Sequence, residues 1–178
     1  MLALLRSVWP WALSLLLIYT VTIGLFPAYT ATLVASEGNA EWRRLFGPLL
    51  FIVFNAGDTI GRNMPCSLRA RGVVLLLCVA RAIFGPLFYV CRTSALASGT
   101  KPNVDSDAFP IIVMLVFAVS NGWLNTCAFM HAPSDVAESE RKRTSTLMVG
   151  CLNTGLTLGS LTSFLIKALL CRCNPFVS

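Results

Sequence analysis

Long runs of apolar residues alternate with short polar connections along the chain. A helix needs roughly 20 mostly apolar residues to cross about 30 Å of hydrocarbon at about 1.5 Å per residue. The predicted spans are residues 8–35, 45–63, 73–91, 108–131 and 144–170. Strands of a β-barrel would be shorter and would alternate in polarity. The pattern therefore predicts an all-α membrane protein in which residues 1–178 form a single membrane domain, a bundle of five transmembrane helices.

The composition points to lipid as the solvent. Hydrophobic residues make up 56% of the chain and charged residues 12%, against roughly 45–50% and about 25% in an ordinary soluble domain. Long stretches lack the polar faces that a water-soluble surface requires. The composition excludes a water-soluble globule and predicts a multi-pass integral membrane protein. Composition does not choose among membranes, and the plasma membrane is the expected location.

The net charge of +6 comes from short basic clusters between the predicted spans. Such clusters fit anchors at lipid headgroups better than the continuous basic face of a nucleic-acid-binding protein. With the N-terminus on one side of the membrane, that side holds Arg6, Arg69, Arg71, Arg141, Lys142 and Arg143, and the other side holds Arg43, Arg44, Arg92, Lys101, Lys167 and Arg172. The basic residues are equal in number on both sides, so the positive-inside rule does not choose a topology.

The seven cysteines are scattered, mostly within the apolar segments. An odd number without paired spacing is not typical of a disulfide framework, and Cys171-x-Cys173 alone is a weak signal for a metal. The pattern favours cysteine as a small apolar filler within helices. No metal or cofactor is predicted.

Small residues recur every four positions in the last span. The ridge comprises Cys151, Gly155, Gly159 and Ser163. Such a ridge allows another helix to approach closely, so we expect Gly155 and Gly159 to serve helix packing. A neighbouring polar stripe either lines a water-filled path or bonds to adjacent helices; it comprises Asn153, Thr157 and Ser160.

The second span contains two opposite charges. Asp58 and Arg62 are four residues apart and share one helical face, which Asn55 and Phe51 extend backwards. A lone ionised residue facing lipid at mid-membrane costs roughly 2.5–3.5 kcal/mol, so the stripe must face the interior of the bundle. The alternative is a salt bridge that only fixes helix packing, although a buried ion pair is often no more stabilising than apolar residues. We therefore predict a substrate site formed by Asp58, Arg62, Asn55 and Phe51.

The chemistry of this stripe suits a polar solute. A carboxylate accepts hydrogen bonds from adjacent hydroxyls, and a guanidinium donates several in a fixed fork. A vicinal diol such as that of ribose matches the Asp58 and Arg62 pair. Phe51 either offers an aromatic face to a base or fills the core.

The segment FNAGDTIGR resembles the FNxxDxxGR signature of the eighth span of equilibrative nucleoside transporters. The matching positions are Phe54, Asn55, Asp58, Gly61 and Arg62. Three further segments resemble the seventh, ninth and tenth spans of that family in the same order: YTVTIGLFP with Pro27, ARAIFGP with Arg81, and FAVSNGWLNTCAF with Ser120, Asn121 and Gly122. The resemblance covers essentially the whole chain.

The resemblance implies a nucleoside or nucleobase carrier that works by alternating access, with half of a fold similar to the major facilitator class. It implies that Asp58 and Arg62 engage the sugar, that the N-terminus of this half is cytoplasmic, and that the chain corresponds to the C-terminal half, spans seven to eleven. The expected partner is then a six-helix N-terminal half or another transporter chain. The chain is either a fragment or a natural half, and the alternative function is that of a non-transporting remnant or a regulatory helical partner of a full-length transporter.

Several other residues have structural interpretations. The structural role is favoured for Arg81, and packing or backbone roles are expected for Gly61, Pro27, Asn121 and Gly122. The segment HAPSD contains His131, Ser134 and Asp135, but no nucleophile elbow surrounds the serine, so no enzyme is predicted. His131 is expected to be an interfacial cap, Trp123 to pack within its span, and Trp9, Trp11 and Trp42 to anchor span ends at the headgroups.

Overall fold

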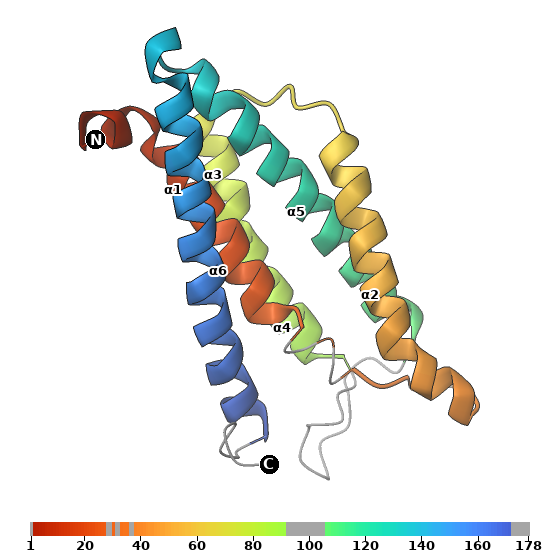
Figure 1. Ribbon diagram of the computed structural model, residues 1–178. Coiled ribbons are helices and arrows are strands. Elements are labelled where there is room, and N and C mark those ends of the chain that lie inside the picture. The colour runs from red at the N-terminus through yellow and green to blue at the C-terminus, as the bar shows by residue number, and fades with distance from the viewer. Residues whose placement is uncertain (1, 28–29, 31–32, 36–37, 92–105, 172–178) are drawn as a thin grey trace.

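The helices run along the chain in the order that the apolar runs predict. The structure, a computed structural model, describes residues 2–27, 30, 33–35, 38–91 and 106–171. The elements are α1 (Leu2–Leu25), α2 (Ala40–Asn63), α3 (Arg71–Ala80), the short 3₁₀ helix η2 (Arg81–Ile83), α4 (Phe84–Tyr89), α5 (Ala108–Ser134), the 3₁₀ helix η3 (Glu138–Glu140) and α6 (Arg141–Cys171). No strand occurs among these described residues. The predicted all-α class is confirmed, with α3, η2 and α4 following one another as a single rod (Figure 1).

Four stretches of the described helices are long and apolar enough to cross a membrane: Leu4–Leu25, Arg71–Tyr89, Ala108–Ser134 and Glu138–Ala168. The fifth long helix, α2, is not among them because it carries the polar and charged stripe. It nevertheless lies beside α5 (Figure 1). The charges of α2 thus belong to a helix that runs with an apolar neighbour, and we expect the two to cross the bilayer together.

The first helix is shorter at its C-terminal end than predicted. The apolar run extends to residue 35, but α1 ends at Leu25. The Phe26 amide still donates to the Thr22 carbonyl at 2.7 Å, whereas Pro27 has no amide proton with which to continue the helix. The exposed Pro27 therefore lies just outside the helix.

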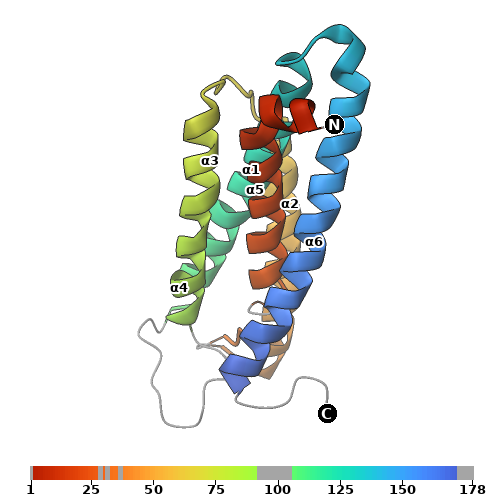
Figure 2. The same ribbon diagram turned by 90° about the vertical axis from the view of Figure 1, so that its left-hand side faces the viewer.

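Two helix pairs organise the bundle. The α1 and α6 helices lie against each other, as do α2 and α5, while the rod of α3 and α4 flanks α1 (Figures 1 and 2). One end of the bundle holds the start of α1, the connection from α2 to α3, and the turn between α5 and α6 (Figure 1). The opposite faces of α2 and α6 remain open to the surroundings, since many of their side chains are exposed.

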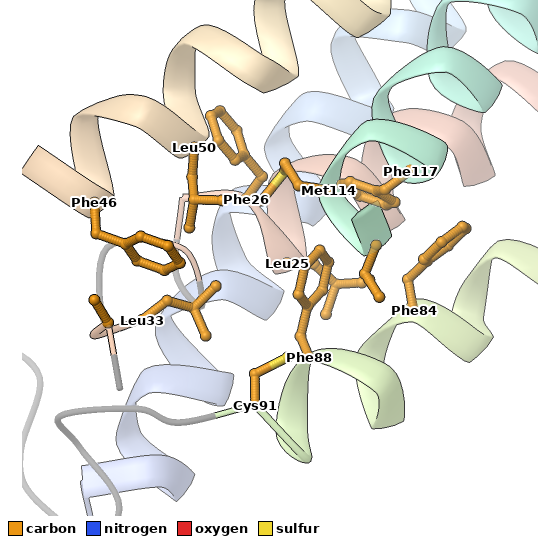
Figure 3. Packing of buried hydrophobic residues seen from close by; sticks show 12 residues of the cluster. Leu25, Phe26, Leu33, Phe46, Leu50, Phe84, Phe88, Cys91, Met114 and Phe117 are labelled. Carbon is orange, nitrogen blue, oxygen red and sulfur yellow. The ribbon is translucent and has the colours of Figure 1, made fainter. Parts of the chain in front are cut away.

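Two apolar clusters fill the interior. Near the C-terminal end of α1, an aromatic cluster centres on Phe46, Phe88 and Phe117, which come from α2, α4 and α5 (Figure 3). Nearer the start of α1, a second cluster includes Trp11, Leu15, Val74, Leu124 and Met148. Together the clusters fix how α1 lies among the other helices.

The predicted ridge of small residues on α6 faces α1. A Cβ placed on Gly155 would lie 2.7 Å from the Leu16 carbonyl oxygen, and one placed on Gly159 would lie 2.9 Å from the Tyr19 carbonyl oxygen. The polar stripe of the same helix is exposed, and the hydroxyls of Thr157 and Ser160 donate to carbonyls of their own helix at 3.0 and 2.9 Å. The glycines therefore bring α1 and α6 into backbone contact.

The cysteine prediction is wrong for one pair. Cys66 and Cys127 form a disulfide across a sequence separation of 61 residues. The pair meets because the chain leaving α2 passes beside α5, a proximity that the spacing in the sequence does not reveal. Cys78 and Cys91 are free and buried, as apolar fillers would be. The side chains of Cys171 and Cys173 lie outside the described part of the structure.

The roles predicted for Trp11 and His131 are also wrong. Trp11 is fully buried rather than anchored at a headgroup, and its indole donates to the Asp135 carboxylate at 2.7 Å. His131 is 7% exposed and lies with its ring centroid 5.6 Å from that of Trp11. Both side chains point into the bundle because α1 and α5 pack together at this end. Trp9, by contrast, is 51% exposed.

Candidate functional site

The candidate site is built around Asp58, which lies on α2 and faces α5. One carboxylate oxygen, Oδ2, accepts from Arg62 Nε at 2.7 Å. The other, Oδ1, accepts from the side-chain amide of Asn121 on α5 at 2.7 Å. The carboxylate is therefore held from its own helix by a cation and from the neighbouring helix by an amide.

Two glycines bring the helices close enough for this bridge. A Cβ placed on Gly61 would lie 2.9 Å from the Trp123 amide nitrogen and would overlap the Val119 carbonyl oxygen. A Cβ placed on Gly122 would lie 2.8 Å from the Arg62 amide nitrogen and would overlap the Asp58 carbonyl oxygen. Real Cβ atoms do not approach backbone atoms so closely, because repulsion rises steeply inside van der Waals contact. The two glycines face each other and set the short Asp58 to Asn121 distance.

Asn121 connects the carboxylate to a buried cation, Arg81. The Asn121 side-chain oxygen accepts from the Thr22 hydroxyl at 2.6 Å and from Arg81 Nη2 at 3.3 Å. Its amide nitrogen faces Asp58. This orientation is the electrostatically favourable one, since the carbonyl end of the amide faces a cation and the amino end faces an anion. Asn121 thus couples the packing of α1, α5 and η2 to the carboxylate on α2.

The buried side chain of Arg81 connects several helices. Its side chain is 2% exposed, and it donates to the Phe117 carbonyl at 2.8 Å, to the Thr22 hydroxyl at 2.9 Å and to the Ser120 hydroxyl. The guanidinium carbon also lies 4.5 Å from the centroid of the Phe117 ring, within the range of a cation–π interaction. These partners engage most of the guanidinium, so Arg81 is placed to hold three elements together.

Arg62 lies at the open end of the network. Its side chain is 45% exposed, and that of Asp58 is 16% exposed. The Tyr19 hydroxyl on α1 interacts with the Arg62 guanidinium and donates to the Asn125 side-chain oxygen at 3.2 Å. The charged groups therefore run from a buried cation, through an amide and a carboxylate, to a cation that is accessible on the face of α2.

The other two residues predicted for the site lie on the same face but make different contacts. The Asn55 amide donates to the carbonyl of Phe51 within its own helix at 2.8 Å, and the residue is exposed. Phe51 is 39% exposed and its ring centroid lies 4.6 Å from that of Phe26. The structure joins Asp58 and Arg62 directly, whereas the Asn55 side chain bonds within its own helix and the Phe51 ring meets Phe26. The prediction that the stripe faces the interior of the bundle is wrong for Phe51, Asn55 and Arg62, which are exposed among the described residues.

The site retains unused hydrogen-bonding capacity. Each oxygen of Asp58 has one protein partner in the network, which leaves further lone pairs on an ionised carboxylate. Arg62 uses Nε for Asp58 and carries two terminal nitrogens on an accessible side chain. The pair can therefore accept from and donate to the hydroxyl groups of one small polar molecule at the same time.

Three residues of this network were not singled out from the sequence: Tyr19, Thr22 and Asn125. Tyr19 and Thr22 are polar residues one helical turn apart within an apolar span, and that spacing is the signal that would have found them. Asn125 lies four residues after Asn121, on the same face of α5. The part of the chain that the structure describes contains no cluster of three or more metal-ligating side chains.

Comparison with known proteins gives a family. The family model described as "Nucleoside transporter" matches residues 1–168. The chain belongs to the nucleoside transporter family. It is 37% identical to human equilibrative nucleoside transporter 2 over 171 residues, covering 93% of this chain and 37% of that relative. Mouse equilibrative nucleoside transporter 2 is 38% identical over 93% of the chain and 38% of its own length, and mouse equilibrative nucleoside transporter 1 is 35% identical over 94% and 38%.

Membership of the nucleoside transporter family confirms that the chain is a multi-pass membrane protein related to transporters and not to enzymes. It also confirms the resemblance on which the family was inferred from the sequence. The chain spans a little over a third of the length of these relatives, at 37% and 38%. What a complete transporter does is therefore a matter of proposal for this chain.

Proposed function

We propose that the chain is the C-terminal half, spans seven to eleven, of a nucleoside or nucleobase carrier that works by alternating access in the plasma membrane. In this proposal Asp58 and Arg62 bind the hydroxyls of the sugar, and Phe51 and Asn55 line the same path. The printed names of the relatives support nucleosides as the class of solute.

The observation that carries the proposal is the accessibility of an ion pair that is rigidly held. Gly61 and Gly122 fix α2 against α5, and Asn121 orients the Asp58 carboxylate. The Arg62 side chain remains 45% exposed on a helix that runs with the apolar spans. A guanidinium that faced the hydrocarbon of a bilayer would be costly. A polar path, or a partner that completes one, therefore suits this face of α2 better than acyl chains do.

Packing alone does not explain the pair. The hydrogen bonds that join α1, α5 and η2 come from Arg81, Thr22 and Asn121, and none of them requires Arg62. A pair needed only for helix packing gains little from an exposed guanidinium, because exposed ion pairs stabilise proteins by about 0–1 kcal/mol. Binding of a substrate would explain why the Arg62 guanidinium is accessible.

The proposal is tested by uptake. The chain is co-expressed with the N-terminal six-span half of a nucleoside transporter in cells that lack nucleoside uptake, and entry of radiolabelled adenosine is measured. Losing a hydrogen bond to a charged group costs about 1.5–3 kcal/mol, so we expect Asp58→Asn to lower uptake by roughly 10-fold to 150-fold at subsaturating adenosine. Glu138→Gln is the matched control, because it removes an exposed carboxylate outside the network, and we expect it to leave uptake unchanged.

The alternative function, that of a non-transporting partner, predicts a different result. A non-transporting regulatory partner gives no uptake with any N-terminal half, and instead co-purifies with a full-length transporter and alters its rate. Uptake that is equal in the wild-type chain and in Asp58→Asn would remove Asp58 from the substrate site while leaving the family assignment untouched. Surface biotinylation of the co-expressed pair tests the plasma-membrane location.

A further inference from the structure

A second group of reactive side chains lies beyond the candidate site, at the end of the bundle where α2 stops. The disulfide between Cys66 and Cys127 joins the connection after α2 to α5. The Nε2 atom of His131 lies 3.3 Å from the Cys66 sulfur. His131 follows Cys127 by four residues on α5, so the two side chains share one helical face. Two sulfurs and an imidazole are therefore gathered at one point.

The two sulfurs differ in access. Cys127 is fully buried, whereas Cys66 lies in the connection between α2 and α3 and is partly exposed. A dissolved thiol would therefore approach the disulfide from the side of Cys66. Thiol–disulfide exchange requires a thiolate to attack one sulfur and the other to leave as a thiolate. Access selects Cys66 as the sulfur that is attacked.

The disulfide also attaches the end of α2 to α5. Arg62 ends the stripe on α2, and Cys66 follows four residues later. Between them the chain is secured to α5 by few contacts: the Trp123 indole donates to the Pro65 carbonyl at 3.1 Å, and the Thr126 hydroxyl meets the Arg62 carbonyl at 3.5 Å. The covalent bond is thus the strongest attachment of the end of α2 to α5.

We propose that Cys66, Cys127 and His131 form a thiol–disulfide exchange site whose co-substrate is a small thiol such as glutathione, and whose redox state sets how firmly the end of α2 is held. In the first step a glutathione thiolate attacks the Cys66 sulfur, the protein disulfide breaks, and Cys127 leaves as a thiolate that takes up a proton. In the second step another glutathione thiolate attacks the glutathione sulfur of the mixed disulfide. Cys66 then leaves as a thiolate, and glutathione disulfide is released.

His131 acts in the second step and in its reverse. Its Nε2 lies 3.3 Å from the Cys66 sulfur, so the imidazole can donate a proton to the departing thiolate. In the reverse direction it accepts the proton of the Cys66 thiol, which produces the thiolate that attacks glutathione disulfide. Overall, two molecules of glutathione are oxidised to one disulfide, and two protein thiols are formed.

The test counts thiols. The full chain is purified in detergent without reductant, incubated with reduced glutathione or with glutathione disulfide, denatured, and labelled with a maleimide carrying a polyethylene glycol tag. We expect two more tags after reduced glutathione than after glutathione disulfide. Cys66→Ser abolishes that difference, whereas Cys151→Ser, which removes a free cysteine, preserves it. Equal tag numbers in the two buffers, or a difference that survives in Cys66→Ser, would overturn the proposal.

Two further measurements separate an exchange site from a merely structural disulfide. His131→Gln is expected to slow the exchange by about 10-fold or more, as the loss of a proton-transfer group does; a wild-type rate would exclude His131 from the site. Amide hydrogen exchange followed by mass spectrometry is expected to speed up over residues 59–70 after reduction. Unchanged protection there would show that the disulfide does not hold the end of α2. None of these readouts requires transport, so they stand apart from the proposed function.

Discussion

The contact between Gly61 and Gly122 is the feature of the fold whose perturbation has the clearest expected cost. In Gly122→Ala the added Cβ would meet the Asp58 carbonyl oxygen and would lie 2.8 Å from the Arg62 amide nitrogen. Both atoms belong to the backbone of α2, so neither can rotate away. The helices must separate by about 1 Å to restore ordinary van der Waals distances.

That separation has two energetic consequences. Overpacking of a close contact costs about 1–3 kcal/mol. The hydrogen bond from Asn121 to Asp58, at 2.7 Å, stretches beyond the useful range of about 3.2 Å, and a bond to a charged group contributes about 1.5–3 kcal/mol. Alanine recovers about 1 kcal/mol of helix propensity relative to glycine. We therefore expect a net loss of about 3 kcal/mol.

Thermal unfolding of the full chain in detergent measures this loss. For a chain of this size each 1 kcal/mol corresponds to about 2–4 °C, so Tm should fall by roughly 6–12 °C. Gly150→Ala is the matched control, because a Cβ at that helical glycine meets nothing within 4 Å, and its Tm should stay the same or rise. If Gly122→Ala and Gly150→Ala unfold at the same temperature, the close approach of α2 and α5 does not contribute to stability as the geometry indicates.

Three other substitutions have distinct expected outcomes. Arg81→Met removes every hydrogen bond that the buried guanidinium donates, although the Phe117 carbonyl still accepts from the Ser120 hydroxyl. Each bond from a charged group contributes about 1.5–3 kcal/mol, so size-exclusion chromatography should show little folded chain. Arg81→Lys should recover part of it, and a fully folded Arg81→Met would contradict the structural role of Arg81. Gly159→Leu should push α6 away from α1 and lower Tm markedly. Ser160→Leu, at the exposed neighbouring position, should not lower Tm in this way. Equal changes in Tm would show that the ridge of small residues does not determine the packing of α6 on α1. Asp135→Asn loses the ion pair with Arg71, in which the Asp135 side chain is 27% exposed and that of Arg71 is 44% exposed, but it keeps a side-chain oxygen that can accept from the Trp11 indole. The free energy of unfolding should therefore change by less than about 1 kcal/mol. A larger change would mean that the amide does not replace the carboxylate as the partner of Trp11, or that the ion pair is better shielded from water than its exposure indicates.

The position of Asp58 and Arg62 on one face followed from the sequence, because residues four apart in a helix always share a face. The sequence could not show that Asn121 would bridge Asp58 to Arg81, since that bridge joins three elements and depends on their rotation and separation. The aromatic partner of Phe51 could not be predicted either. Phe26 directly follows α1, whose end the apolar run placed ten residues further along the chain.

The sequence by itself determined the helical class, the order of the spans and the helix that carries the charges. It could do so because hydrocarbon thickness and backbone hydrogen bonding act on each segment locally, whatever its neighbours are. Only the tertiary structure decided the Cys66 to Cys127 disulfide and the burial of Trp11 and His131. These features are contacts between elements distant along the chain. They depend on how closely two helices approach, which small residues such as Gly122 permit but which no local pattern specifies.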